Sequence, residues 1–107
     1  MKKKKCKVYI SLPISGYDIS ERRNTAKAME NKLRKLGYDV FNPLENGLPT
    51  YASTNQHMKA DIKALLGCDA VIFMQGFNHS AGCHTELTIA MAIGLEVWFE
   101  ETENVTL

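Results

Sequence analysis

Apolar and polar positions follow two different periods along the chain. Four short segments rich in β-branched, aromatic and other apolar residues predict β-strands, and they cover residues 7–11, 38–42, 70–74 and 95–99. Between them, apolar residues recur every three or four positions, a spacing that predicts helices with one buried face. These helices cover residues 18–36, 54–66 and 80–93. Strands and helices therefore alternate along the chain.

Capping residues mark the ends of each predicted helix. Asp18 or Ser20 can cap the first helix and Thr54 or Asn55 the second, because short polar side chains satisfy the free N–H groups of a helix start. Ser80 opens the third helix. A glycine follows each helix, as is common at helix ends: Gly37, Gly67 and Gly94. The buried faces expected for the first two helices consist of Ala26, Met29, Leu33 and Leu36, and of Met58, Ile62, Leu65 and Leu66.

The alternating order predicts an α/β fold. We expect a three-layer sandwich with a mainly parallel sheet of four to five strands and helices on both faces, Rossmann-like or flavodoxin-like. The segment over residues 70–74 is apolar throughout, which is typical of a central parallel strand. In such folds, ligands bind beyond the carboxyl ends of the strands. Any chemistry is therefore expected in residues 12–17, 42–53 and 75–82.

Length and composition fit one globular domain over residues 1–107. The chain is 45% hydrophobic and 23% charged, which rules out a disordered, collagen-like or disulfide-stapled chain. Its net charge is +1, but five of its 13 basic residues lie within residues 2–7. Residues 1–6 are therefore expected to form a flexible basic leader. The remainder carries more acidic than basic side chains, which argues against binding a nucleic-acid polymer.

The sequence also argues against several locations and cofactors. No apolar run approaches the roughly 18 residues of a membrane span, so no membrane association is expected. Three cysteines without a CxxC spacing are expected to be reduced thiols of a cytoplasmic protein. Cys83 and His84 are adjacent but lack partners at zinc-site spacing, so no metal site is expected. Neither a GxGxxG nor a P-loop motif is present, which argues against a standard dinucleotide or P-loop site.

Three side chains are candidates for catalysis. Glu86 lies on an otherwise apolar helix, where a carboxylate is either buried or faces a cleft. Asp61 lies among apolar residues on the preceding helix, with His57 one turn earlier. Tyr9 lies near the carboxyl end of the first strand, where its hydroxyl can reach the same edge of the sheet.

Each candidate also has a purely structural interpretation. Glu86 can lie on a thin polar stripe and favour the positive end of its helix, and Asp61 can form a surface pair with the histidine one turn earlier. Tyr9 can be a buried tyrosine whose hydroxyl is satisfied. At the start of the third helix, Ser80 and Gly82 can bind an anion through free N–H groups, or Ser80 can simply cap the helix.

Three stretches together resemble the nucleoside 2-deoxyribosyltransferase superfamily, which includes the deoxynucleoside-5′-monophosphate N-glycosidases. They are VYISLPISG, GYDVFNP and ADIKALLGCDAVIFMQGFNHSAGCHTELTIAMAIG, which span most of residues 8–95. The resemblance implies that Glu86 is the nucleophile at the anomeric carbon of the sugar, that Tyr9 orients it, and that Asp61 contacts and helps to protonate the base. It implies no metal or redox cofactor.

Substrate-binding residues are expected at the strand ends, and the set consists of Ser11, Pro13, Ser15, Gly16, Asn42, Gly76, Ser80 and Gly82. Some positions depart from the pattern of the superfamily. The transferases have an aspartate where this chain has Ser80, and the monophosphate glycosidases have a serine there. Those glycosidases also have a serine and an arginine where this chain has Pro13 and Ser15. Arg22 or Arg23 is the candidate source of the missing charge.

The predicted function is cleavage or exchange of the N-glycosidic bond of a (deoxy)nucleoside or its 5′-monophosphate, a small-molecule substrate. The resemblance implies a homodimer or higher oligomer, for which Trp98 and Phe99 are candidate interface residues. One alternative is a non-catalytic nucleotide-binding or sensor module of the same fold. Another is a protein-interaction domain with a vestigial pocket. The intact set of Tyr9, Asp61 and Glu86 favours catalysis over both.

Overall fold

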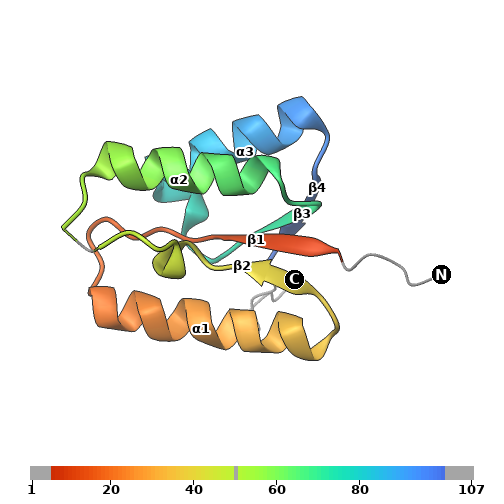
Figure 1. Ribbon diagram of the computed structural model, residues 1–107, viewed down its shortest axis with the longest axis horizontal. Helices are drawn as coiled ribbons and strands as arrows, with labels where there is room; N and C mark the ends of the chain where they lie inside the picture. The colour runs from red at the N-terminus through yellow and green to blue at the C-terminus, as the bar shows by residue number, and fades with distance from the viewer. Residues whose placement is uncertain (1–5, 50, 101–107) are drawn as a thin grey trace, which may run out of the picture.

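Three helices enclose a four-stranded parallel sheet in the computed structural model, which describes residues 6–49 and 51–100 (Figure 1). The strands are β1 (Lys7–Ser11), β2 (Asp39–Phe41), β3 (Ala70–Phe73) and β4 (Glu96–Phe99), and the helices are α1 (Ile19–Lys35), α2 (Thr54–Leu66) and α3 (Ala81–Ile93). Two short 3-10 helices, η1 (Pro43–Glu45) and η2 (Phe77–His79), lie in segments predicted as loops. The predicted three-layer α/β sandwich is confirmed.

The strand order β2-β1-β3-β4 places β1 and β3 at the centre of the sheet. Neighbouring strands are parallel, and Val8 of β1 lies opposite Val40 of β2 on one side and Ala70 of β3 on the other. The chain leaves β1 for β2 on one side and then crosses to β3 on the other. The connections therefore diverge between the carboxyl ends of β1 and β3, which is the switch point where open α/β sheets bind ligands.

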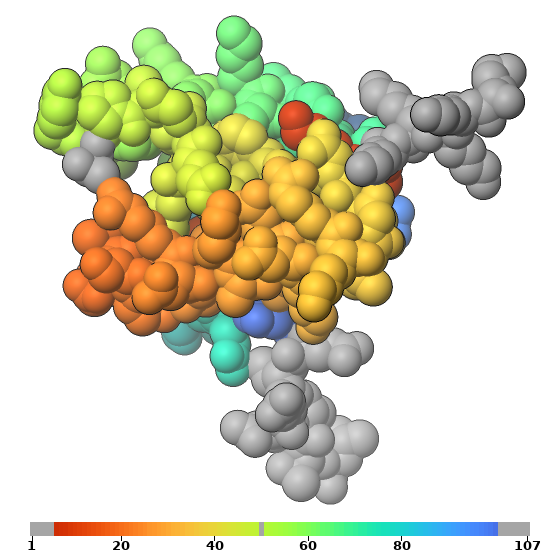
Figure 2. All heavy atoms as spheres, turned by 60° about the horizontal axis from the view of Figure 1, so that its bottom comes forward, coloured from red at the N-terminus to blue at the C-terminus, as the bar shows by residue number. Residues whose placement is uncertain are grey.

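Alternation along β1 assigns its side chains to two different layers. Val8 and Ile10 pack in the core between the sheet and α1, and α1 covers its face of the sheet along its length (Figure 2). Tyr9 packs in the core beneath α2 and α3, which lie on the opposite face (Figure 1). Successive side chains of a strand point to opposite faces. Ser11 therefore lies on the same face as Tyr9, where α3 covers it.

Side-chain caps fix where each helix begins. Asp18 caps α1, which is one of the two residues predicted for that position. The cap of α2 is Ser53 rather than the predicted Thr54 or Asn55, because Ser53 forms a reciprocal capping box with the third residue of the helix. Ser80 caps α3 through its side-chain oxygen, the simpler of the two interpretations of this serine.

Several apolar residues predicted to be buried are exposed. Leu36 is 67% exposed and Leu66 is 56% exposed. Leu36 caps the carboxyl end of α1 and Leu66 is the last residue of α2, so both lie where the helix ends and the chain turns away from the sheet. The carboxyl end of α3 also exposes Met91 and Ile93.

The two aromatic side chains of β4 differ in exposure. Trp98, expected at an interface between copies, packs edge-to-face on Tyr38 of the same chain with ring centroids 5.2 Å apart. Phe99 is 54% exposed and packs beside Phe77. Residues 1–5 of the predicted basic leader lie outside the described residues. Across residues 6–49 and 51–100, none of the helices has the length and apolarity needed to cross a membrane.

Candidate functional site

Glu86 lies at the switch point of the sheet, in the second turn of α3. Its side chain is buried, with 7% exposed, and both of its carboxylate oxygens are held from β1. The Tyr9 hydroxyl donates a hydrogen bond to Oε2, and the Ser11 hydroxyl donates one to Oε1 at 2.6 Å. Because Tyr9 and Ser11 are two residues apart on one strand, both hydroxyls point toward α3. The carboxylate is therefore fixed at two points.

The surroundings of Glu86 favour its protonated form. Burial is the main cause that raises its pKa, and the negative charge of Asp61 acts in the same direction. The hydrogen bonds from Ser11 and Tyr9 lower this pKa but do not outweigh burial. Burial and the charge of Glu86 raise the pKa of Tyr9 far above its ordinary range, so Tyr9 remains a hydrogen-bond donor.

Asp61 lies half-buried on α2, close enough for its charge to act on Glu86. Its Oδ1 accepts a hydrogen bond from Nδ2 of Asn46 at 3.0 Å. Burial raises the pKa of Asp61, while the hydrogen bond from Asn46 and the charge of His57 oppose that rise. One interpretation of the sequence is a direct surface pair between His57 and Asp61, one helical turn apart. The structure instead joins them through Asn46, which also lies 3.1 Å from Nδ1 of His57.

Asn46 is the functional candidate that sequence reasoning missed. It lies between η1 and α2, in the segment expected to shape the site. An asparagine followed by glycine is a common turn pair, and nothing in the sequence pattern indicates that this amide reaches Asp61 of the next helix. Only the position of the segment, after the carboxyl end of β2, could have drawn attention to it.

The loop after β1 is held by a buried arginine. Arg22 donates to the carbonyl oxygen of Pro13 at 3.2 Å, pairs with Glu21 at 2.6 Å, and lies 4.3 Å from the centre of the Tyr17 ring. Pro13 is buried, whereas Ser15, expected to bind substrate, is exposed. The charge of Arg22, considered as a substitute phosphate ligand, is therefore used within the fold.

The three glycines that were predicted to bind substrate have different surroundings. Gly16 lies in the loop after β1 with a positive φ of 86° and has open space around it. Gly76 has a φ of 90°, and a Cβ there would lie 3.1 Å from Oη of Tyr17 and 3.2 Å from Cγ of Pro13. The loops after β1 and β3 therefore meet at Gly76, which leaves no room for a side chain. A Cβ at Gly82 would lie 3.4 Å from Cε of Met58, so this glycine allows α3 to approach α2.

Asn42, which was predicted to bind substrate, forms hydrogen bonds that do not involve Glu86. It is buried and donates to Oε1 of Glu30 at 3.2 Å, while its Oδ1 accepts from the N–H of Leu44 at 3.0 Å. The first contact joins Asn42 to α1 on the opposite face of the sheet, and the second caps η1. Asn42 therefore holds the segment after β2 rather than approaching Glu86.

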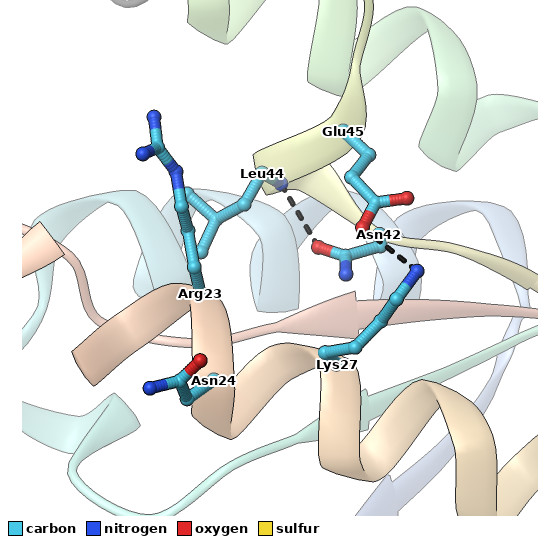
Figure 3. Close-up of a pocket in the computed structure, with 6 residues that line it drawn as sticks. All are labelled: Arg23, Asn24, Lys27, Asn42, Leu44 and Glu45. Atoms are coloured by element: carbon cyan, nitrogen blue, oxygen red, sulfur yellow. Dashed lines mark hydrogen bonds and ion pairs between the residues drawn. The ribbon is translucent and has the colours of Figure 1, made fainter. Parts of the chain in front are cut away.

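A hollow of about 390 Å³ lies beside Asn42, between α1 and η1 (Figure 3). It is lined by Arg23, Asn24, Lys27, Asn42, Leu44 and Glu45. Lys27 pairs with Glu45 at 3.0 Å, and both polar ends of the Asn42 amide are already bonded. The hollow therefore has the volume of a small ligand, and three of its polar side chains, Lys27, Asn42 and Glu45, already have partners.

Comparison with solved structures finds a related fold. The chain is similar to the structure of Clostridium botulinum CMP N-glycosidase, BcmB, with a TM-score of 0.60 and 22% identity, over 87% of this chain and 69% of that chain. This similarity shows that the two chains share a fold. No curated protein matches the chain. A family model described as "Domain of unknown function (DUF4406)" matches residues 6–99, and the chain therefore belongs to the DUF4406 family.

Proposed function

We propose that this protein cleaves or exchanges the N-glycosidic bond of a (deoxy)nucleoside or its 5′-monophosphate. The observation that carries the proposal is the buried Glu86 carboxylate, held by hydroxyls at both oxygens. A second carboxyl, Asp61, lies nearby at the same edge of the sheet. Glycosidic bonds are commonly broken by two carboxyl groups, one attacking the anomeric carbon and one giving a proton to the leaving group. The fold shared with a CMP N-glycosidase supports this assignment.

Glu86 is the proposed nucleophile. An oxygen of its carboxylate attacks C1′ of the sugar, the C1′–N bond breaks, and its electron pair leaves with the base. Asp61 gives its proton to the departing nitrogen, so that the base leaves neutral. Water then attacks C1′, its proton returns to Asp61, and the C1′–O bond to Glu86 breaks. Attack by a second base in place of water yields a new nucleoside.

The raised pKa of Asp61 fits its role as the acid, whereas burial of Glu86 disfavours the ionised form that must attack. A general acid must hold a proton near neutral pH, and burial raises the pKa of Asp61 toward that range. Glu86 must be ionised to attack, and the hydroxyls of Tyr9 and Ser11 stabilise its charge without adding a counter-ion. The charge of Asp61 also disfavours ionisation of Glu86, so protonation of Asp61 favours the ionised nucleophile.

A panel of substrates tests the proposal. Purified protein is incubated with deoxynucleosides, ribonucleosides and their 5′-monophosphates, with and without a second free base, and free and exchanged bases are separated by chromatography. Base release that disappears in the Glu86→Gln variant would establish the reaction, and a new nucleoside would identify transfer. Binding of a nucleotide without any base release would favour the non-catalytic nucleotide-binding module instead.

Replacing Tyr9 with phenylalanine tests how Glu86 is held. The ring still stacks on Phe41, with centroids 5.3 Å apart in the parent, but the hydrogen bond to Glu86 is lost. A hydrogen bond to a charged group contributes about 1.5–3 kcal/mol, so kcat/KM is expected to fall by about 10- to 100-fold. Because that bond lowers the pKa of Glu86, its loss moves the acid limb of the pH–rate profile to higher pH.

The matched control is Tyr38→Phe. Tyr38 packs on Trp98, so its hydroxyl is not part of the Glu86 arrangement and its removal should leave kcat/KM and the pH profile unchanged. An acid limb in Tyr9→Phe that coincides with that of the parent would contradict the proposed hold on Glu86.

A further inference from the structure

The side chain of Asn46 has every hydrogen-bonding group of its amide engaged. Its Oδ1 accepts from the backbone N–H of Leu48 at 3.0 Å. Its Nδ2 lies 3.0 Å from Oδ1 of Asp61 and 3.1 Å from Nδ1 of His57. The Leu48 N–H can bond only to an oxygen, so it fixes which end of the amide faces the backbone. The NH₂ group therefore faces Asp61 and His57 and donates one hydrogen to each.

These bonds define the hydrogen positions on both partners. An NH₂ group donates and does not accept, so when the His57 ring is neutral its Nδ1 is the acceptor. The neutral imidazole ring then carries its proton on Nε2. In the same way, Oδ1 of Asp61 is an acceptor from Asn46. When Asp61 is protonated, the proton must lie on Oδ2.

We propose that Asn46 is a positioning residue that confines the transferable proton of Asp61 to Oδ2, which makes this oxygen the one that protonates the leaving base. This inference rests on the proposed glycosidic-bond cleavage and deepens it by assigning the acid to one atom. Asn46 itself makes no contact with reacting atoms in this scheme. It acts through Asp61, and the Leu48 N–H holds it in the orientation that allows it to do so.

Titratable groups of three elements surround Asp61. His57 of α2 acts on the pKa of Asp61, and the charge of Asp61 acts on Glu86 of α3 and Tyr9 of β1. The hydrogen bond from Asn46 stabilises the ionised form and lowers the pKa of Asp61 against the effect of burial. A general acid loses activity as pH rises through its pKa. Removing the donor raises that pKa and therefore moves the alkaline limb of the pH–rate profile upward.

The substitution that removes the donor and keeps the turn is Asn46→Asp, which also adds a carboxylate beside Asp61. An aspartate keeps an oxygen for the Leu48 N–H, so the turn is retained, but it replaces the NH₂ group with a second oxygen that cannot donate. We expect kcat to fall by about 10- to 100-fold, as for loss of a hydrogen bond to a charged group. We also expect KM to change little and the alkaline limb to move to higher pH. A parent-like kcat and alkaline limb in Asn46→Asp would overturn the proposal.

A double-substitution cycle separates positioning from folding. In the Asp61→Asn background there is no proton to place, so adding Asn46→Asp should cost no further activity. An additional loss of the same size in both backgrounds would mean that Asn46 acts only through the loop structure and would overturn the proposal. Thermal unfolding of all four proteins identifies any variant that does not fold.

The hydrogen-bond network also has a readout that needs no turnover. Nitrogen NMR of the parent, at a pH where the His57 ring is neutral, should show the ring proton on Nε2. In Asn46→Asp the proton should lie on Nδ1, which donates it to the new carboxylate. His84 is the internal control, because its Nε2 faces the carbonyl of Asn78 at 2.8 Å and should stay protonated in both. A parent His57 protonated on Nδ1 would refute the network whatever the activity. An unchanged parent network without base release from any substrate would instead refute the proposed function, and with it the catalytic role of Asn46.

Discussion

The Glu86→Gln variant is expected to lose base release by about 10⁴-fold or more, as enzymes do when their nucleophile is removed, while its folded state becomes more stable near neutral pH. The first effect follows from the chemistry, because an amide is a poor nucleophile toward C1′. The second follows from the environment of the carboxylate. Tyr9 and Ser11 hold Glu86 through hydroxyl groups, and hydroxyls can accept as well as donate, so the neutral amide fits the same contacts.

The pH dependence gives the stability effect its sign. Burial raises the pKa of Glu86 in the folded protein above its ordinary value, so the folded state binds the proton more tightly than the unfolded state. Stability from this group is fully present below the ordinary glutamate pKa and is lost as pH rises through the raised value. The melting temperature of Glu86→Gln, followed from pH 4 to 8, should therefore exceed that of the parent by a margin that grows with pH.

Glu30→Gln is the matched control for stability. Glu30 is buried to a similar extent, with 6% exposed, but it faces Arg34 at 2.8 Å and Lys27 at 3.4 Å. Burial alone would raise its pKa, yet its hydrogen bonds from Arg34, Asn42 and Lys27 outweigh burial and lower it. Glutamine there should decrease the melting temperature at neutral pH. A decrease of similar size in Glu86→Gln would show that Glu86 is a structural ion rather than a destabilised nucleophile.

The parts of the fold set by hydrophobic periodicity could be predicted from the sequence, and so could the environment of Glu86. A carboxylate on an apolar helix must be either buried or at a cleft, and residues two apart on β1 must share a face. Neither rule assigns α3 to the face of Tyr9 and Ser11, and that placement comes from the structure. Periodicity failed at Leu36 and Leu66, since it does not register where a helix leaves the sheet.

The loops could not be predicted because their structure depends on individual hydrogen bonds. Arg22 belongs to the polar positions of the α1 pattern, yet it is buried by its bond to the carbonyl of Pro13 and by the ring of Tyr17. Asn46 resembles an ordinary turn asparagine until the structure places α2 beside it. Such bonds join residues whose spacing in the sequence follows no period, so no pattern of apolar positions contains them.

The Asp61→Asn variant is expected to lose activity to an extent that depends on the leaving base. With an ordinary base, loss of the general acid should lower kcat by about 10²- to 10⁴-fold. Asparagine is isosteric and keeps an oxygen for Nδ2 of Asn46, so the loop and the helix should stay in place. A nucleoside with a base alkylated at N7, which leaves without needing a proton, should be cleaved at a rate within about 10-fold of the parent, because only proton transfer has been removed.

Asp69→Asn provides the control, since Asp69 accepts from the backbone N–H of Lys7 at 2.8 Å, at the amino end of the sheet and away from the site. Its activity on both substrates should match that of the parent. Asp61→Asn should also lose the alkaline limb of the pH–rate profile, since the group whose deprotonation stops the reaction is gone. An equal loss on the ordinary and the alkylated nucleoside, with the alkaline limb retained, would mean that Asp61 holds the substrate or the helix and that another group supplies the proton.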